Sequence, residues 1–210
     1  MDSKARCNDL FECPDDSDEQ NCEPILINKN SYRNVMPHFS KDQKNEIKVT
    51  AELHSIKDID QLAMTFLGEL KIILHWKDAR ITFKDLGPNG SYLNDDWKKQ
   101  IWLPPLYFSN TVEKLPIYKD DGYTVKILRE AKHTVNDISE LNEGCIFNGD
   151  ENHLQLTSHY EYTFHCTFNL SKFPFDTQHC HMILKVPSEM REFVKLKPNK
   201  TLIFRGKELL

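Results

Sequence analysis

Apolar and polar residues alternate along residues 154–168 of the chain. One parity carries Leu154, Leu156, Tyr160, Tyr162, Phe164, Cys166 and Phe168, and the other carries Gln155, Thr157, His159, Glu161, Thr163, His165 and Thr167. A period of two is typical of a β-strand that has one face on the core and the other toward solvent. We therefore predict a half-buried strand over these residues.

The same period recurs in two earlier segments. The core-facing parity carries Ile47, Val49, Ala51 and Leu53 in the first segment, and Met64, Phe66, Gly68, Leu70, Ile72, Leu74 and Trp76 in the second. These segments predict two further strands, connected by a turn over residues 54–60. Short helical turns are expected only near residues 32–36, so the chain is predicted to be mainly β from about residue 23 onward.

Two cysteines bracket the segment that begins at the end of the strand predicted over residues 154–168. A disulfide between Cys166 and Cys180 would close a loop with thirteen residues inside it. The return segment 182–186 keeps its apolar residues at the parity of Cys180, so both sulfur atoms are expected to face the core. Inside the loop, residues 173–175 read Phe-Pro-Phe, and the fixed backbone angle of proline predicts a rigid apolar tip.

Length, charge and composition narrow the class of protein. The chain has 210 residues and a mass of 24.7 kDa, enough for one sizeable β domain and a small appendage. Its 27 Lys and Arg residues are outnumbered by 32 Asp and Glu residues, and its pI is near 6.0, which argues against nucleic-acid binding. We find no nucleophile elbow, phosphate loop or zinc-protease motif, so we do not expect an enzyme.

Cysteines and glycosylation motifs indicate an oxidising compartment. The chain has six cysteines, and Asn-x-Ser/Thr sequons begin at Asn89, Asn169 and Asn199. We therefore expect an extracellular glycoprotein. The sequence contains no run of about 18 apolar residues that would span a membrane, and residues 1–6 do not resemble a signal peptide.

Three motifs follow one another in an informative order. Residues 76–81 read Trp-Lys-Asp-Ala-Arg-Ile, residues 101–110 contain Trp-Leu-Pro-Pro, and residues 166–180 form the cysteine-bounded loop. Together they resemble the Trp-x-Asp, Trp-x-Pro-Asp and Cys-loop motifs of the Cys-loop receptors, the pentameric neurotransmitter-gated ion channels, with Pro105 in place of the aspartate. The resemblance implies that residues 23–210 form an immunoglobulin-like β-sandwich of about ten strands, the extracellular ligand-binding domain of a plasma-membrane channel subunit.

The resemblance also implies what surrounds this domain. Such a receptor has a signal peptide before the domain and four transmembrane helices after it, so we expect the sequence to be incomplete and truncated before the last ligand loop. Agonists of the family bind between neighbouring subunits of a homo- or hetero-pentamer. The alternative is a soluble secreted ligand-binding protein of the same fold, and the sequence downstream of residue 210 would distinguish the two.

In this family the Cys-loop couples agonist binding to pore opening. Carried over to this chain, Phe173, Pro174 and Phe175 would press on the transmembrane helices. Asp176 would pair with an arginine just before the first of those helices, and the turn around Asp60 would lie beside the loop. Apart from the family, the same residues fit a well-packed hairpin tip with one solvated aspartate.

The aromatic agonist box of the family is poorly represented in this chain. Two of its aromatic positions fall on Pro187 and Lys71, whereas Tyr107, five residues after Trp102, is a candidate agonist contact. Lys71 lies at the polar parity of its strand, so it would face away from the core and favour an anionic or zwitterionic agonist over an amine. The alternatives are a solvated surface lysine and a tyrosine that packs within the fold.

Residues 1–22 resemble the second half of an LDL-receptor class A module, in the spacing of Cys7, Cys13 and Cys22 and in the Ser-Asp-Glu before the last cysteine. The resemblance implies a disulfide between Cys7 and Cys22, and it leaves Cys13 and Cys145 without an assigned partner. It also implies a Ca²⁺ site in the full-length parent, with oxygen ligands from Asn8, Leu10 (backbone carbonyl), Glu12, Asp18 and Glu19. A frayed acidic tail is the alternative for this segment.

A Cys/His metal-binding domain is a further alternative, from a different class of protein. Its ligands would be the two loop cysteines and the histidines beside them, His165, His179 and His181. The parity places these histidines on the face opposite Cys166 and Cys180, so four ligands would converge on a zinc ion only around a bulge. The pattern therefore favours a disulfide over a metal site.

Overall fold

The computed structural model of the protein describes residues 14, 25–27, 33–37, 44–84, 86, 89–113, 118–130, 146–199 and 203–204. Within these residues it contains twelve strands, a four-residue α-helix and a three-residue 3-10 helix. The predicted mainly β fold is thus confirmed, and its several sheets are consistent with a β-sandwich. The described part has two strands more than the approximate number expected.

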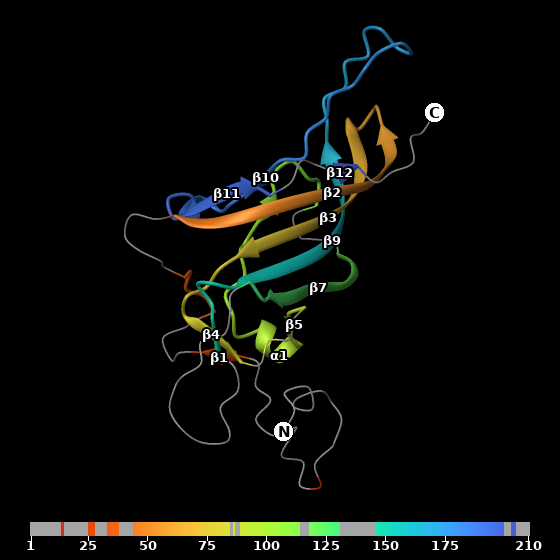
Figure 1. The fold of residues 1–210 in the computed structure, drawn as a ribbon. Coiled ribbons are helices and arrows are strands. Elements are labelled where there is room, and N and C mark those ends of the chain that lie inside the picture. Colours follow the sequence, from red (N-terminus) through yellow and green to blue (C-terminus); the bar gives the residue numbers. More distant parts are fainter. Residues whose placement is uncertain are drawn as a thin grey trace.

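One large sheet forms the main layer of the molecule (Figure 1). Its strands in spatial order are β11 (Val194–Pro198), β2 (Asn45–Asp60), β3 (Thr65–Trp76), β9 (His153–His165), β7 (Tyr118–Leu128) and β5 (Ser91–Tyr92), and β12 (Ile203–Phe204) also pairs with β2. The pairs β2–β3, β3–β9, β9–β7 and β7–β5 are antiparallel, whereas β11 and β12 run parallel to β2.

Two small sheets and two short helices complete the described elements. The first small sheet has the order β1 (Ile25–Ile27), β4 (Ile81–Lys84) and β8 (Ile146–Asn148), and the second pairs β6 (Tyr107–Phe108) with β10 (Leu184–Lys185). The helices are α1 (Asp95–Lys98) and η1 (Ser188–Met190). Side chains of the large sheet and of both small sheets meet in one apolar core, which contains Trp76, Phe83, Phe147 and Phe164 and has Phe108 packed against it.

The alternation predicted for β3 and β9 is confirmed by burial. In β3, Leu70, Ile72, Leu74 and Trp76 are buried, and the residues between them are half-buried. β3 pairs with β9 over its whole length, so the buried side chains of the two strands form one continuous apolar face. β9 ends at His165, slightly before the predicted end of the strand.

The turn predicted over residues 54–60 is wrong, because β2 continues to Asp60 and the chain turns over residues 61–64. The carboxylate Oδ1 of Asp60 accepts hydrogen bonds from the backbone N–H groups of Leu62 (2.8 Å) and Ala63 (2.9 Å), which fixes this later turn. Two register irregularities within the β2–β3 pair accompany the extension.

The helical prediction is also corrected. Residues 33–36, the described part of the segment predicted to contain helical turns, include a turn and a bend and no helix. The α-helix of the described residues lies instead at Asp95–Lys98, where the side chain of Asn94 caps it by accepting a hydrogen bond from the N–H of Trp97 (3.0 Å). An asparagine followed by two aspartates was the available sequence signal for this helix.

A buried ion pair fixes the turn between β3 and β4. Arg80 donates from Nε and Nη2 to the two carboxylate oxygens of Asp78, at 2.8 Å and 2.7 Å, and from Nη1 to the carbonyl of Val35 at 2.7 Å. Asp78 is 1% exposed. Gly149 packs against this turn so closely that a Cβ atom would overlap the carbonyl oxygen of Asp78, so the position requires glycine.

Candidate functional site

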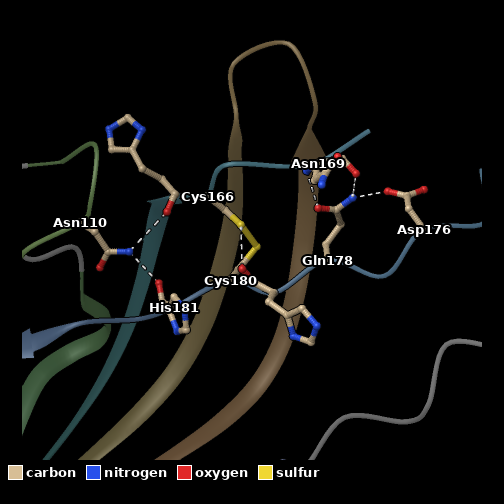
Figure 2. The surroundings of a disulfide bond; sticks show 9 residues. Asn110, Cys166, Asn169, Asp176, Gln178, Cys180 and His181 are labelled. Atoms are coloured by element: carbon tan, nitrogen blue, oxygen red, sulfur yellow. Dashed lines mark hydrogen bonds between the residues drawn. A yellow bond between two sulfur atoms is a disulfide. The ribbon is translucent and has the colours of Figure 1, made fainter. Parts of the chain in front are cut away.

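The structure contains the predicted disulfide between Cys166 and Cys180, with Cα atoms 5.3 Å apart (Figure 2). Cys166 directly follows β9, is 6% exposed, and donates its N–H to the carbonyl of Met64 (2.9 Å) in the β2–β3 turn. Cys180 is exposed, so the prediction that both sulfurs face the core is wrong. The return segment forms a strand only at Leu184–Lys185, which leaves Cys180 beyond the sheet.

Asn110 holds the two ends of the disulfide loop together. Its Nδ2 donates to the carbonyls of His181 (2.6 Å) and His165 (3.4 Å) (Figure 2). Its Oδ1 accepts from the N–H of Ile183 (3.0 Å). Because only an amide side chain both donates and accepts in this way, Asn110 acts as a staple between β9 and the return segment. The sequence reasoning included Asn110 in a motif but assigned it no role.

A second amide organises the interior of the loop. The Nε2 of Gln178 donates to the carboxylate of Asp176 and to the carbonyl of Asn169 (2.9 Å), while its Oε1 accepts from the N–H of Asn169 (2.9 Å) (Figure 2). Asp176 is half-buried. Its carboxylate therefore belongs to an ordered loop and retains acceptor capacity for another donor.

The tip of the disulfide loop and the β2–β3 turn lie at the same end of the molecule (Figure 1). A cavity of about 1070 Å³ is lined from both sides, by Ile59 and Gln61 of the hairpin and by Phe173 and Asp176 of the loop. Ile59 (61%) and Phe173 (62%) of this lining are exposed, and so are Leu62 (98%) of the turn and Phe175 (92%) of the loop. Asp60, the last residue of β2, directly precedes this turn, and the gating role expected of Asp60 and the loop stays a prediction.

Tyr107 lies at the rim of a separate, aromatic cavity of about 450 Å³. Tyr160 and Tyr162 stack with ring centroids 5.6 Å apart, and Phe108 meets Tyr162 edge-on at 5.4 Å. Ser158 also lines the cavity, and its buried Oγ has no hydrogen-bond partner. Aromatic walls around an unsatisfied hydroxyl are suited to a small organic ligand.

Lys71 lies on the opposite face of the large sheet from this cavity. It is half-buried and is paired in register with Glu52 of β2 and His159 of β9, whereas its neighbours in sequence, Leu70 and Ile72, face the core. The structure therefore does not bring Lys71 and Tyr107 together within one chain.

Of the remaining predicted sites, the asparagines of the glycosylation sequons lie in the described residues and the calcium ligands lie outside them. The sequon asparagines Asn89, Asn169 and Asn199 are all exposed and therefore accessible to a glycosylating enzyme. Glycosylation of these residues stays a prediction. The LDL-receptor class A segment lies outside the described residues. This includes its ligands Asn8, Leu10, Glu12, Asp18 and Glu19 and its cysteines Cys7, Cys13 and Cys22, as well as Cys145.

The metal-binding alternative conflicts with the disulfide. Both sulfur atoms of Cys166 and Cys180 are joined to each other, so neither is a thiolate that would bind zinc. Over the described part of the chain, no cluster of three or more His, Cys, Asp or Glu side chains is arranged to hold a metal ion.

Comparison with known families agrees with the fold and the disulfide loop. The model of the neurotransmitter-gated ion-channel ligand binding domain matches residues 18–208, and the chain belongs to this family. The family comprises extracellular, non-enzymatic domains of multi-subunit membrane channels, which bind small-molecule ligands. No curated protein matches the chain. None of the helices in the described residues is long and apolar enough to cross a membrane.

Proposed function

We propose that this chain is the agonist-binding domain of a pentameric neurotransmitter-gated channel subunit at the plasma membrane, and that the loop 166–180 couples agonist binding to pore opening. The observation that carries this proposal is the end of the sandwich where the disulfide loop meets the β2–β3 turn. There the chain exposes Ile59 and Phe173 in the lining of one shared cavity, and it also exposes Leu62 in the turn and Phe175 in the loop.

Exposed apolar side chains gathered in one place mark a contact surface. The disulfide and the hydrogen bonds of Asn110 fix the base of the loop. A displacement of the loop tip would therefore also displace the end of β9. A transmembrane domain that packs on Phe175 and Leu62 would cover these side chains. A soluble secreted protein of the same fold would leave them in water, which disfavours that alternative.

The agonist site would lie between subunits. Tyr107 and the aromatic cavity belong to one face of the domain and Lys71 to the other, so a ring of identical copies would bring one face against the other at every interface. The positive charge of Lys71, which is half-buried on its face of the sheet, favours an anionic or zwitterionic agonist over a simple amine.

The experiment is a concentration–response measurement on the channel that carries this domain, with amino acids and simple amines as candidate agonists. We expect currents from a zwitterionic agonist, and we expect Lys71→Gln to raise the half-maximal concentration at least tenfold, about the cost of one charged hydrogen bond. Lys99→Gln, which removes an exposed lysine beside Asp96, is the control and should change nothing. Currents evoked by none of these compounds at confirmed surface expression would contradict the proposal.

A further inference from the structure

Lysines gather around one cavity at the end of the large sheet farthest from the disulfide loop. The cavity measures about 670 Å³, and its described lining contains Lys44, Lys48, Lys77, Lys195 and Lys197 with a single carboxylate, that of Glu46. The chain as a whole has a net charge of -5. A concentration of positive charge on an acidic protein is a local feature that its overall composition does not explain.

The strand register explains why these lysines meet. β11 runs parallel to β2 and places Lys195 beside Glu46 and Lys197 beside Lys48. Glu46 and Lys48 are two residues apart on one strand, so all four side chains share a face of the sheet. Lys77, which directly follows β3, lines the same cavity.

The one carboxylate does not neutralise the cavity. Glu46 is ion-paired with Lys197, and its pKa is lowered by that hydrogen bond and further by the nearby charges of Lys48 and Lys195. Lys48, Lys77 and Lys195 have no ion-pair partner within the described part of the chain. Among the described residues, three ammonium groups therefore face the same space as a single carboxylate that is already ion-paired with Lys197.

The histidine and the tryptophans that line the cavity do not neutralise the positive charge of the lysines. His153 lines it and is hydrogen-bonded to Glu130 (2.7 Å), and burial lowers the pKa of His153, an effect that Lys77 and Lys48 increase. Trp76 and Trp102 add two buried rings, and the indole N–H of Trp76 has no hydrogen-bond partner. The cavity is thus lined by cations beside an aromatic wall.

We propose that this cavity is a binding site for a small multivalent anion, one that carries two or more phosphate or carboxylate groups. Its volume suits a small organic molecule and is larger than a single chloride ion needs. Three lysines without an ion-pair partner among the described residues favour an anion with several charges, since each charged contact adds to the affinity. Neither Tyr107 nor Lys71 lines the cavity, so the site is separate from the proposed agonist site.

The test is calorimetric titration of the whole chain with tripolyphosphate, and in parallel with citrate, at physiological ionic strength. We expect binding of at least one of the two, and we expect the double variant Lys48→Gln/Lys195→Gln to weaken it at least tenfold. The matched control is Lys172→Gln/Lys185→Gln, which removes the same charge from two exposed residues outside the cavity and should bind as the parent does.

Circular dichroism establishes that each variant is folded, and Lys77→Gln gives a second, independent reading should the double variant fail to fold. The absence of binding by both anions would overturn the proposal. Equal weakening in the cavity variants and in the control would also overturn it, because the anion would then respond to overall charge and not to this site. Tight binding of heparin fragments with no binding of either small anion would assign the lysines to a polyanionic surface instead.

Discussion

The two ends of the large sheet differ in how their side chains are packed. At the Trp76 end, the carboxylate of Asp78 is buried and both of its oxygens are bonded to Arg80. At the other end, Leu62 and Phe175 are almost fully exposed. The Asp78 end is therefore stabilised by contacts within the chain, whereas the other end presents exposed apolar side chains. Substitutions at the two ends should accordingly affect different properties of the protein.

The largest effect on stability is expected from Asp78→Ala. This variant leaves the guanidinium of Arg80 without its buried counter-charge, and breaking such a pair costs about 3–5 kcal/mol of unfolding free energy. Urea denaturation followed by circular dichroism measures it. The control Asp96→Ala removes an exposed carboxylate whose contact with Lys99 is 3.5 Å long, and it should cost less than about 1 kcal/mol. Equal losses of unfolding free energy in the two variants would show that the Asp78–Arg80 pair stabilises the fold no more than an exposed ion pair does.

Loss of the disulfide is expected to have the next largest effect. The Cys166→Ser/Cys180→Ser variant opens a loop whose ends are 14 residues apart, which costs about 3 kcal/mol in the chain-entropy estimate. Urea denaturation of the variant and of the parent under reducing conditions should give the same loss. Peptide mapping without reduction should recover Cys166 linked to Cys180, and a link from Cys166 to Cys145 would contradict the structure.

Phe175→Ala tests whether the exposed loop tip contributes to stability. Because Phe175 is exposed, its removal should change the unfolding free energy by less than about 0.5 kcal/mol. The matched variant Phe164→Ala empties a buried core position and should cost about 3–5 kcal/mol. In the assembled channel, Phe175→Ala should reduce agonist-evoked current although the domain is stable. A large loss of stability in Phe175→Ala would mean that the loop tip is packed within the domain.

The smallest effect concerns pH and the Trp76 end. Burial lowers the pKa of His153 below its ordinary value of 6.5. On acidification through pH 6.5 the unfolded chain therefore binds a proton before the folded chain does, and stability falls. Urea denaturation at pH 7 and pH 5 should show a shallower fall for His153→Gln than for the parent. Identical slopes would show that His153 does not contribute to the acid sensitivity of the fold.

The strands that have one apolar face could be predicted from the sequence, whereas elements fixed by distant contacts could not. β3 and β9 were predictable because each strand has one apolar face, which a period of two reports directly. The extension of β2 was not, since residues 55–60 are held in the strand by pairing with β3, including the hydrogen bond from Ser55 to Glu69 (2.9 Å). The helix α1 is only four residues long, too short to show a helical period.

The site was predictable to a similar degree. The disulfide pair was found because both cysteines bracket a loop that follows a regular strand. The role of Asn110 was not found, because its partners His165 and His181 lie 55 and 71 residues away in sequence, and no local pattern records such contacts. The lysine cavity depends in the same way on the parallel pairing of β11 with β2, which brings residues far apart in sequence onto one face.

The most direct test of the account is Asp176→Asn in the channel that carries this domain. The asparagine can still accept the hydrogen bond from Gln178, so the loop keeps its shape and loses one negative charge. If that charge pairs with an arginine before the first transmembrane helix, agonist-evoked current per surface receptor should fall while surface expression is unchanged. Unchanged current at equal surface expression would contradict the coupling role assigned to the loop.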